Sequence, residues 1–168
     1  MIKMASKQII TENSIRRIQV EKVVINIGVG RSGESIERAQ NVLNEISNQT
    51  PKTTIAKKAV REWGIHKGEP IGTIVTLRGN KAIDVLKKLF LSKDNKLPKK
   101  SFDNQGNFAF GIKEHIDIPG IKYDPNIGIL GLGVSVSLVR PGFSVKVRSK
   151  HKARIGKTHK ITKQEAIK

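Results

Sequence analysis

Hydrophobic and polar residues alternate along three stretches of the chain. Within residues 18–27, 71–78 and 132–139, side chains that are mostly apolar recur at alternate positions on one face: Val23, Ile25 and Ile27; Ile71, Thr73, Val75 and Leu77; and Leu132, Val134, Val136 and Leu138. Successive side chains of a strand point to opposite faces, so this alternation predicts three strands with one face in a core. A Pro-Gly turn at residues 141–142 leads into a fourth alternating run over residues 143–148, which predicts a hairpin.

Two other stretches have the spacing of amphipathic helices. Apolar residues recur at helical intervals over residues 34–47 and again over residues 80–92, so each helix would bury one side. Residues 52–57, 107–112 and 114–118 are expected to be short strands or extended segments. Strands interspersed with two helices favour an α+β fold, in which the helices lie on one face of a largely antiparallel sheet.

The last part of the chain, from residue 148 onward, is polar and basic. We therefore divide the chain into a single α+β domain over residues 1–147 and a basic C-terminal extension over residues 148–168. Within the extension, Thr162-Lys163-Gln164-Glu165 matches a capping box, so a short helix is expected to begin there. The extension has little apolar surface of its own, and we expect it to be ordered only against a partner.

The charge of the chain is abnormal in sign. There are 32 Lys and Arg residues against 14 Asp and Glu residues, which gives a formal net charge of +18 and a pI near 10.4. Self-repulsion of this size favours a polyanionic partner, either nucleic acid or an anionic membrane surface. No run approaches the about 20 apolar residues that span a bilayer, so we expect no membrane partner. The absence of cysteine removes disulfides, thiolate catalysis and the common zinc sites.

The positive charge is concentrated in two segments. Residues 140–168 hold ten Lys and Arg residues against one acid, and residues 52–68 hold five against one acid. Neutralising phosphates with such cations releases counterions and so favours nucleic-acid binding. Residues 57–70, which also contain the single Trp63, are interpreted as a mobile basic loop.

A glycine pattern typical of dinucleotide-binding sites is present in Gly28-Val29-Gly30-Arg31-Ser32-Gly33. It lies between a predicted strand and a predicted helix, where backbone N–H groups could hold a pyrophosphate. A ribose-binding carboxylate would then be expected about 20 residues further on. Residues 52–58 contain no acid, and alternating strands do not suit a parallel sheet. The pattern is better interpreted as a tight turn, and a dinucleotide-dependent oxidoreductase is an unfavoured alternative.

No set of catalytic or metal-binding residues is recognisable. Two of the four His residues lie near the C-terminus and one lies in the basic loop, while His115 stands between acids on an expected strand edge. None has metal-ligand spacing with an acidic or sulfur companion. Asp103 and Asp117 have no fixed geometry as a carboxylate pair. We therefore expect no cofactor, no metal and no enzymatic activity.

The kind of nucleic acid is not decided by charge. The sequence shows no helix-turn-helix, zinc-finger or basic-zipper pattern, and no aromatic RNA-recognition signature. Shape-based binding to a folded RNA remains, with Asn26, Thr76 and Arg78 as polar contacts on a flat sheet face. A free RNA chaperone or tRNA-binding factor would use the same surfaces and stays open as an alternative.

Six motifs occur in an order that resembles one protein family. They are Val23-Val24-Ile25-Asn26-Ile27-Gly28-Val29-Gly30, Gln49-Thr50-Pro51, Ala56-Lys57-Lys58, Lys67-Gly68-Glu69-Pro70-Ile71-Gly72, Val75-Thr76-Leu77-Arg78-Gly79 and Ser101-Phe102-Asp103-Asn104-Gln105-Gly106-Asn107-Phe108. Together they resemble the universal large-ribosomal-subunit protein five family, from about residue 18 to residue 140. The basic extension looks like that of the archaeal and eukaryotic branch and favours an archaeal member.

This resemblance implies a curved, largely antiparallel sheet packed against helices, in a structural protein of the large ribosomal subunit. Members bind 5S rRNA and help to anchor it in the central protuberance. They also contact large-subunit rRNA, and a basic loop reaches towards the P-site tRNA. The expected partners are these RNAs and neighbouring ribosomal proteins of the central protuberance, and the expected location is cytoplasmic and ribosome-associated.

The resemblance and the charge pattern together name the expected contact residues. For rRNA they are Asn26, Gln49, Trp63, Thr76, Arg78, Arg148, Lys150, Lys152, Arg154 and Lys157. For tRNA they are Lys57, Lys58, Arg61, His66 and Lys67, within residues 56–68. The family usually carries an aromatic residue where Trp63 stands, which implies stacking on an RNA base or ribose. Glu62 departs from what a phosphate contact favours, because it adds a negative charge to this loop.

Overall fold

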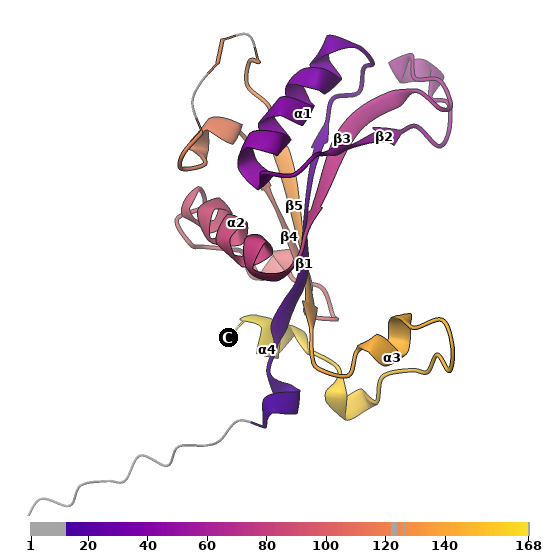
Figure 1. Cartoon of the computed structure of the whole chain (residues 1–168), viewed down its shortest axis with the longest axis vertical. Coiled ribbons are helices and arrows are strands. Elements are labelled where there is room, and N and C mark those ends of the chain that lie inside the picture. The colour runs from indigo at the N-terminus through magenta and orange to yellow at the C-terminus, as the bar shows by residue number, and fades with distance from the viewer. Residues whose placement is uncertain (1–12, 122–123, 126, 168) are drawn as a thin grey trace, which may run out of the picture.

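The computed structural model describes residues 13–121, 124–125 and 127–167, and it shows a five-stranded sheet with two helices on one side (Figure 1). The strands follow the order β2-β3-β1-β5-β4, and each neighbouring pair is antiparallel. Their bounds are β1 (Gln19–Gly28), β2 (Lys52–Ile55), β3 (Pro70–Leu77), β4 (Phe108–Ile112) and β5 (Leu132–Val139). The predicted α+β fold with a largely antiparallel sheet is confirmed.

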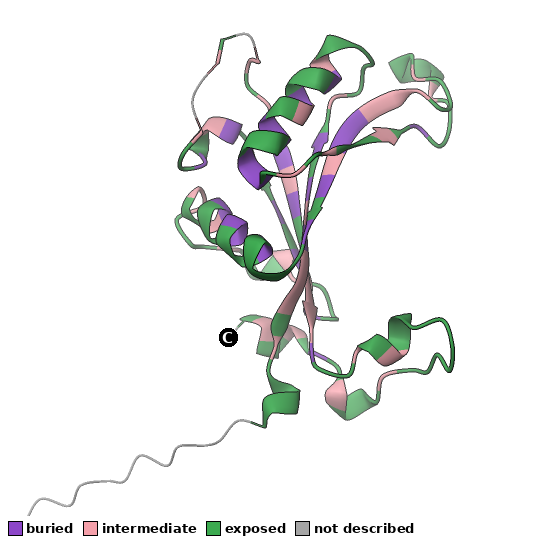
Figure 2. Ribbon diagram, in the orientation of Figure 1, coloured by how far each residue is buried: buried purple, intermediate pink, exposed green. Residues whose placement is uncertain are grey.

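The two long helices cover one face of this sheet. They are α1 (Glu34–Ser47) and α2 (Gly79–Leu91), each within one residue of its predicted bounds. Figure 2 shows the buried residues of both helices turned towards the strands. Helix α1 ends at Asn48, which has a left-handed φ of 49° and donates its N–H to the carbonyl oxygen of Asn44 at 2.8 Å. This left-handed residue closes the helix and lets the chain return into β2.

The core lies between the helices and the central strand β1. Val23, Ile25 and Ile27 of β1 are at most 1% exposed, whereas Asn26 between them is exposed. The neighbouring strands and helices complete the core with Ala39, Leu43, Val75, Leu77, Ala82, Leu89, Val134 and Val136. Burial of one side of each strand is the reason that the period of two in the sequence identified β1, β3 and β5.

The glycine turn connects β1 to α1 and is held by β3. The N–H groups of Val29 and Gly30 both donate to the carbonyl oxygen of Ile71, at 3.0 and 2.9 Å. Gly30 and Gly33 have φ angles of 75° and 102°, which residues with a side chain rarely adopt. These amides bond to the sheet rather than pointing at a ligand, and the strands beside the turn are antiparallel. The interpretation as a tight strand–helix connection is confirmed.

The hairpin predicted after β5 is wrong. The one-turn helix α3 (Ser144–Val147) stands where a returning strand was expected. The strand order explains the error, because β5 pairs with β1 on one side and with β4 on the other. Neither edge of β5 is therefore free for another strand. Alternation of apolar and polar residues indicates that the two faces of a segment have different surroundings. It does not show that a strand edge is available for pairing.

The extended segment expected over residues 114–118 is also wrong, because a 3-10 turn forms at His115–Asp117. His115 is 1% exposed. Its backbone N–H donates to the carbonyl oxygen of Leu130 at 3.0 Å, and its Nδ1 accepts from the N–H of Leu130 at 3.3 Å. The buried imidazole is thus a structural residue that anchors the approach to β5.

The C-terminal extension packs on the domain, which differs from the expectation that only a partner would order it. The predicted capping box forms, since the N–H of Thr162 donates to Glu165 Oε2 at 2.9 Å, and α4 (Lys163–Ile167) follows. Ile161 is 2% exposed, and a Cβ added at Gly106 would overlap its side chain. Burying one isoleucine contributes about 1.5–3 kcal/mol, so Ile161 helps to hold this segment against the domain. The division of the chain at residue 148 stays a prediction.

Candidate nucleic-acid interface

The face of the sheet opposite α1 and α2 exposes its polar positions. Asn26 in β1, Thr76 in β3 and Ser135 in β5 are all exposed on this face. The register places Val24 opposite both Thr76 and Ser135, so Thr76, Val24 and Ser135 form one row across the sheet. We call this surface the uncovered face, and it offers uncharged polar groups at positions fixed by strand pairing.

Asn26 and Thr76 are diagonal neighbours on the uncovered face. Asn26 is opposite Ile74 in β3, two residues before Thr76, an arrangement that separates the two positions by about 7–8 Å. Neither side chain makes a hydrogen bond to another residue in the part of the chain that the structure describes. Their amide and hydroxyl groups are therefore available to a ligand. The structure brings together these two predicted rRNA contacts.

Gln49 and Arg78 lie on segments that border the same strands. Gln49 is partly exposed in the connection between α1 and β2, three residues before Lys52, whose partner in β3 is Ile74. Arg78 follows β3 directly, and its Nη1 is 3.8 Å from Oε1 of Glu21. An exposed ion pair of this length contributes little to stability. The guanidinium of Arg78 therefore remains able to bind a phosphate.

The segment expected to be a mobile basic loop has the shape of a hairpin. At its base, Ala56 donates its N–H to the carbonyl oxygen of Glu69 at 2.8 Å, and Gly68 donates to that of Ala56 at 2.9 Å. Further along, Val60 pairs with Ile65 in an isolated antiparallel bridge. These backbone bonds give the basic loop, residues 57–70, a defined shape that its composition did not suggest.

Trp63 lies within the basic loop, in the short 3-10 helix η2 (Arg61–Trp63), and is 73% exposed. The predicted tRNA contacts on the same loop are all exposed, and none forms an ion pair with a described residue: Lys57, Lys58, Arg61, His66 and Lys67. The structure thus groups Trp63 with these residues, on a different element from Asn26 and Thr76. Glu62 in the same turn is also exposed.

Glu69 joins the basic loop to the glycine turn. Its carboxylate accepts a hydrogen bond from the hydroxyl of Ser32 at 2.8 Å and another from the backbone N–H of His66 at 2.9 Å. The His66 bond, followed by the Ser32 bond, holds the pKa of Glu69 below its ordinary value. Sequence reasoning missed this contact because Ser32 and Glu69 are 37 positions apart. Glu69 was visible only as part of a family motif.

Arg140 fastens the C-terminal extension to the end of β5. Its side chain is only 4% exposed, and Nη2 donates to Glu165 Oε1 at 2.9 Å. Nη1 donates to the carbonyl oxygens of His159 and Lys160 at 3.4 and 3.2 Å. The backbone N–H of Thr162, then Arg140, lowers the pKa of Glu165 to about 2. Sequence reasoning counted Arg140 as one basic residue among ten and missed this role.

The predicted rRNA contacts of the extension share one exposed segment. They are Arg148, Lys150, Lys152, Arg154 and Lys157. Ala153 donates its N–H to the carbonyl oxygen of Val145 at 3.2 Å, which brings the segment back against α3. Arg148 Nε donates to the carbonyl oxygen of His151 at 2.8 Å. The cations are therefore presented on a closed loop rather than on a free chain end.

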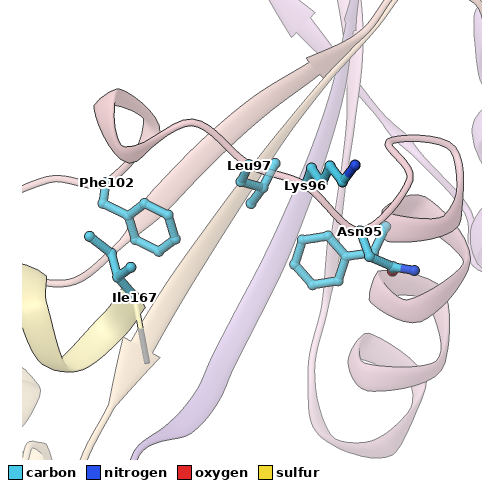
Figure 3. A pocket seen from close by; sticks show the side chains of 6 residues that line it. Asn95, Lys96, Leu97, Phe102 and Ile167 are labelled. Atoms are coloured by element: carbon cyan, nitrogen blue, oxygen red, sulfur yellow. The ribbon is translucent and has the colours of Figure 1, made fainter.

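The depression between the end of α2 and α4 is lined mostly by apolar side chains. Its volume is about 380 Å³, and Figure 3 shows Phe102 and Ile167 facing each other within it. The other lining residues are Phe90, Asn95, Lys96 and Leu97. Nowhere in the described ranges do three or more His, Cys, Asp or Glu side chains gather as a metal site would require. Among the described helices, none has the length and apolar character needed to cross a membrane.

Comparison with known families decides what kind of protein carries these surfaces. A family model for the C-terminus of the ribosomal L5 family matches residues 70–168, and a second model, described as "Ribosomal protein L5", matches residues 13–66. The chain belongs to the ribosomal protein L5 family. The resemblance found in the six motifs is thereby confirmed. Membership of the L5 family also makes the chain a structural ribosomal protein that works in the cytoplasm, and not an enzyme.

Several archaeal relatives in the L5 family are similar over nearly their whole length. A protein of Nitrosopumilus maritimus is 55% identical, and the match covers 93% of this chain and 90% of the relative. A protein of Cenarchaeum symbiosum is 53% identical, with 90% of each chain covered. One of Pyrobaculum aerophilum is 48% identical, with 91% and 86% covered. Each is named large ribosomal subunit protein uL5, which confirms the archaeal type expected from the extension.

Proposed function

We propose that this ribosomal protein is a component of the large ribosomal subunit, where it binds 5S rRNA through the uncovered face and helps to anchor it in the central protuberance. The names of its archaeal relatives support its place in the large subunit. The observation that carries the 5S rRNA site is the pair of exposed side chains, Asn26 and Thr76, which have no hydrogen-bond partner in the described residues. Gln49 and Arg78 border this pair and add an amide and a guanidinium.

The basic C-terminal segment is proposed to bind large-subunit rRNA. Its five exposed cations lie on a loop that Arg140 and Ile161 hold against the domain. A loop that is already docked loses less conformational freedom when it meets a polyanion than a free chain end would. Contacts of this kind neutralise phosphates and are indifferent to base identity.

The basic loop is proposed to contact the P-site tRNA. It projects between β2 and β3 as a hairpin and carries an exposed aromatic residue among exposed cations. Aromatic side chains stack on bases or riboses, while neighbouring cations hold the backbone. Trp63 is therefore assigned to this tRNA contact rather than to 5S rRNA. Neighbouring proteins of the central protuberance are proposed as further partners.

Asn26→Ala and Thr76→Ala test the 5S rRNA site. Each change should weaken binding to 5S rRNA about tenfold and binding to bulk RNA much less, because a specific hydrogen bond is lost while the charge stays the same. Filter binding or fluorescence anisotropy at fixed salt measures both affinities. Asn41→Ala, on the exposed side of α1, is the matched control and should change neither.

An equal loss of affinity for both RNAs would contradict a specific site on the uncovered face. Association with the subunit is a separate question from the choice of RNA. Sedimentation of the protein with the large subunit after a high-salt wash distinguishes a resident ribosomal protein from a free RNA chaperone or tRNA-binding factor. A resident protein should stay with the subunit, whereas a free factor should remain in the supernatant.

A further inference from the structure

The side chain of Asn26 lies close to a glycine on the neighbouring strand β5. Its partner in β5 is Gly133. A Cβ placed on that glycine would lie 2.7 Å from Oδ1 of Asn26, 3.4 Å from Cγ and 3.6 Å from Nδ2. Oδ1 of Asn26 therefore lies where a side chain at position 133 would clash with it, whereas Cγ and Nδ2 would be at ordinary contact distances. The end of the Asn26 side chain thus lies beside Gly133 of β5.

The two sides of Asn26 are not equivalent. On the β3 side its partner is Ile74, a branched apolar residue that is partly buried. On the β5 side its partner has no side chain, and the next residue in the same row is Gly111 of β4. In this row a side chain therefore stands on the β3 side of Asn26, and no side chain stands at the two positions on its β5 side. The Asn26 amide occupies the β5 side.

The backbone of Gly133 does not itself require glycine. Its φ is not among the positive values found in the described residues, and it pairs regularly with both neighbouring strands. Glycine inside a strand weakens it and marks a place where another group approaches the backbone closely. The structure therefore explains glycine at position 133 by the space that the Asn26 amide occupies.

We infer that Gly133 is a positioning residue for RNA recognition, because its missing side chain lets the amide of Asn26 lie flat along the sheet. This inference rests on the proposed binding of 5S rRNA to the uncovered face. An amide that lies along the sheet presents two N–H donors and one C=O acceptor to a ligand on the uncovered face. The groups that it can read are ribose 2′-hydroxyls and base edges, which in RNA donate and accept hydrogen bonds.

A double-mutant cycle on 5S rRNA binding tests this role. Asn26→Ala should weaken binding about tenfold, and Gly133→Ala at least about threefold, because the clash turns the amide away from its position. Gly133→Ala should cost nothing more once Asn26→Ala is present, since the group it displaces is already gone. Gly111→Ala is the matched control, because it lies in the same row and its Cβ would meet only the carbonyl oxygen of Leu132 at 3.9 Å.

The side-chain NH₂ signals of Asn26, measured by NMR on the free protein, give a second readout. They should shift in Gly133→Ala and stay in place in Gly111→Ala. If Gly133→Ala fails to fold, the double variant should fold again, because the clash partner has been removed; failure of both would overturn the inference.

Each remaining outcome separates the inference from the proposed function. Normal binding by Gly133→Ala beside weak binding by Asn26→Ala would overturn the positioning role and leave the 5S rRNA site intact. Normal binding by Asn26→Ala would overturn the site itself. Gly133→Ala could lower 5S rRNA affinity equally in the original protein and in Asn26→Ala, or Gly111→Ala could lower it as much as Gly133→Ala does. Either result would show that the RNA packs directly on the glycines, and it would overturn the positioning role.

Discussion

The uncovered face and the two basic segments differ in how they are suited to RNA. On the uncovered face, strand pairing sets the spacing of the uncharged groups of Asn26, Thr76 and Ser135, with Lys52 in the same row as Asn26. In the basic loop and the C-terminal segment the groups are cations on loops, and a few backbone bonds and side-chain contacts hold each loop. Cations neutralise any phosphate, whereas amides and hydroxyls at fixed positions distinguish one RNA surface from another. The proposed RNA binding would therefore draw its affinity and its specificity from separate parts of this chain.

Neutralising the C-terminal segment should have the largest effect. Replacing its five cations, Arg148, Lys150, Lys152, Arg154 and Lys157, with Gln should lower the slope of log affinity against log salt by about 4 and weaken rRNA binding at least about hundredfold at 0.1 M salt, because each cation neutralises about one phosphate. A salt titration of binding to large-subunit rRNA measures both quantities.

Two controls sharpen this comparison. Asn26→Ala should leave the salt slope unchanged, because it removes no charge. Gln at Lys81, Lys87 and Lys88, which are exposed on α2, should lower the slope much less than the five changes in the C-terminal segment. An unchanged slope after neutralising the C-terminal segment would mean that this segment does not touch RNA.

Trp63→Ala should have an intermediate effect and tests where Trp63 belongs. Loss of base stacking should weaken tRNA binding about tenfold, while 5S rRNA binding stays within about twofold because the uncovered face is intact. Trp63→Phe should restore most of the tRNA affinity, since it keeps an aromatic face. If 5S rRNA binding falls and tRNA binding does not, Trp63 belongs with the uncovered face as the sequence first suggested.

Acid should affect the docking of the C-terminal segment modestly and the uncovered face hardly at all. The pKa of Glu165 is lowered from 4.5 to about 2 in the folded protein. The ionised carboxylate therefore stabilises the fold fully above about pH 4.5, and this contribution is lost as the pH falls from there through about 2. The effect is small because the Glu165 side chain is 42% exposed.

Melting temperatures between pH 2 and pH 6 measure this contribution. Glu165→Gln should lower the melting temperature at pH 6 and make its pH dependence shallower. Glu45→Gln, at an exposed position of α1, is the matched control and should change neither. Identical pH profiles for the original protein and Glu165→Gln would mean that the ion pair with Arg140 does not hold the segment.

Periodicity predicted the sheet and the helices well where one side of an element is buried. Helix α1 has its expected bounds because residues such as Ile36, Leu43 and Ile46 recur on the side that meets the core. The same reasoning failed over residues 143–148, where alternation continues after β5 has both of its edges occupied. The local spacing of apolar residues shows which side of an element is buried. Whether a strand edge is available depends on strands elsewhere in the chain.

The contact residues of the candidate interface stay a prediction, and the structure shows how they are grouped in space. Asn26 and Thr76 stand out in the sequence as polar positions within apolar strands, and pairing of β1 with β3 brings them together. Trp63 lies on the basic loop, as the sequence indicated, and its grouping with Asn26 and Thr76 by resemblance stays a prediction. The roles of Arg140 and Glu69 were not predicted, because each depends on a partner distant in sequence.

By itself the sequence determined the family, the charge, the elements with one buried side and the polar residues of the uncovered face. These properties are local or compositional, so neighbouring residues are enough to reveal them. Only the tertiary structure decided that Gly133 lies beneath the Asn26 amide, that Ile161 and Arg140 dock the extension, and that the glycine turn bonds to β3. Each of these contacts joins atoms from separate elements, and their geometry exists only after the strands have paired.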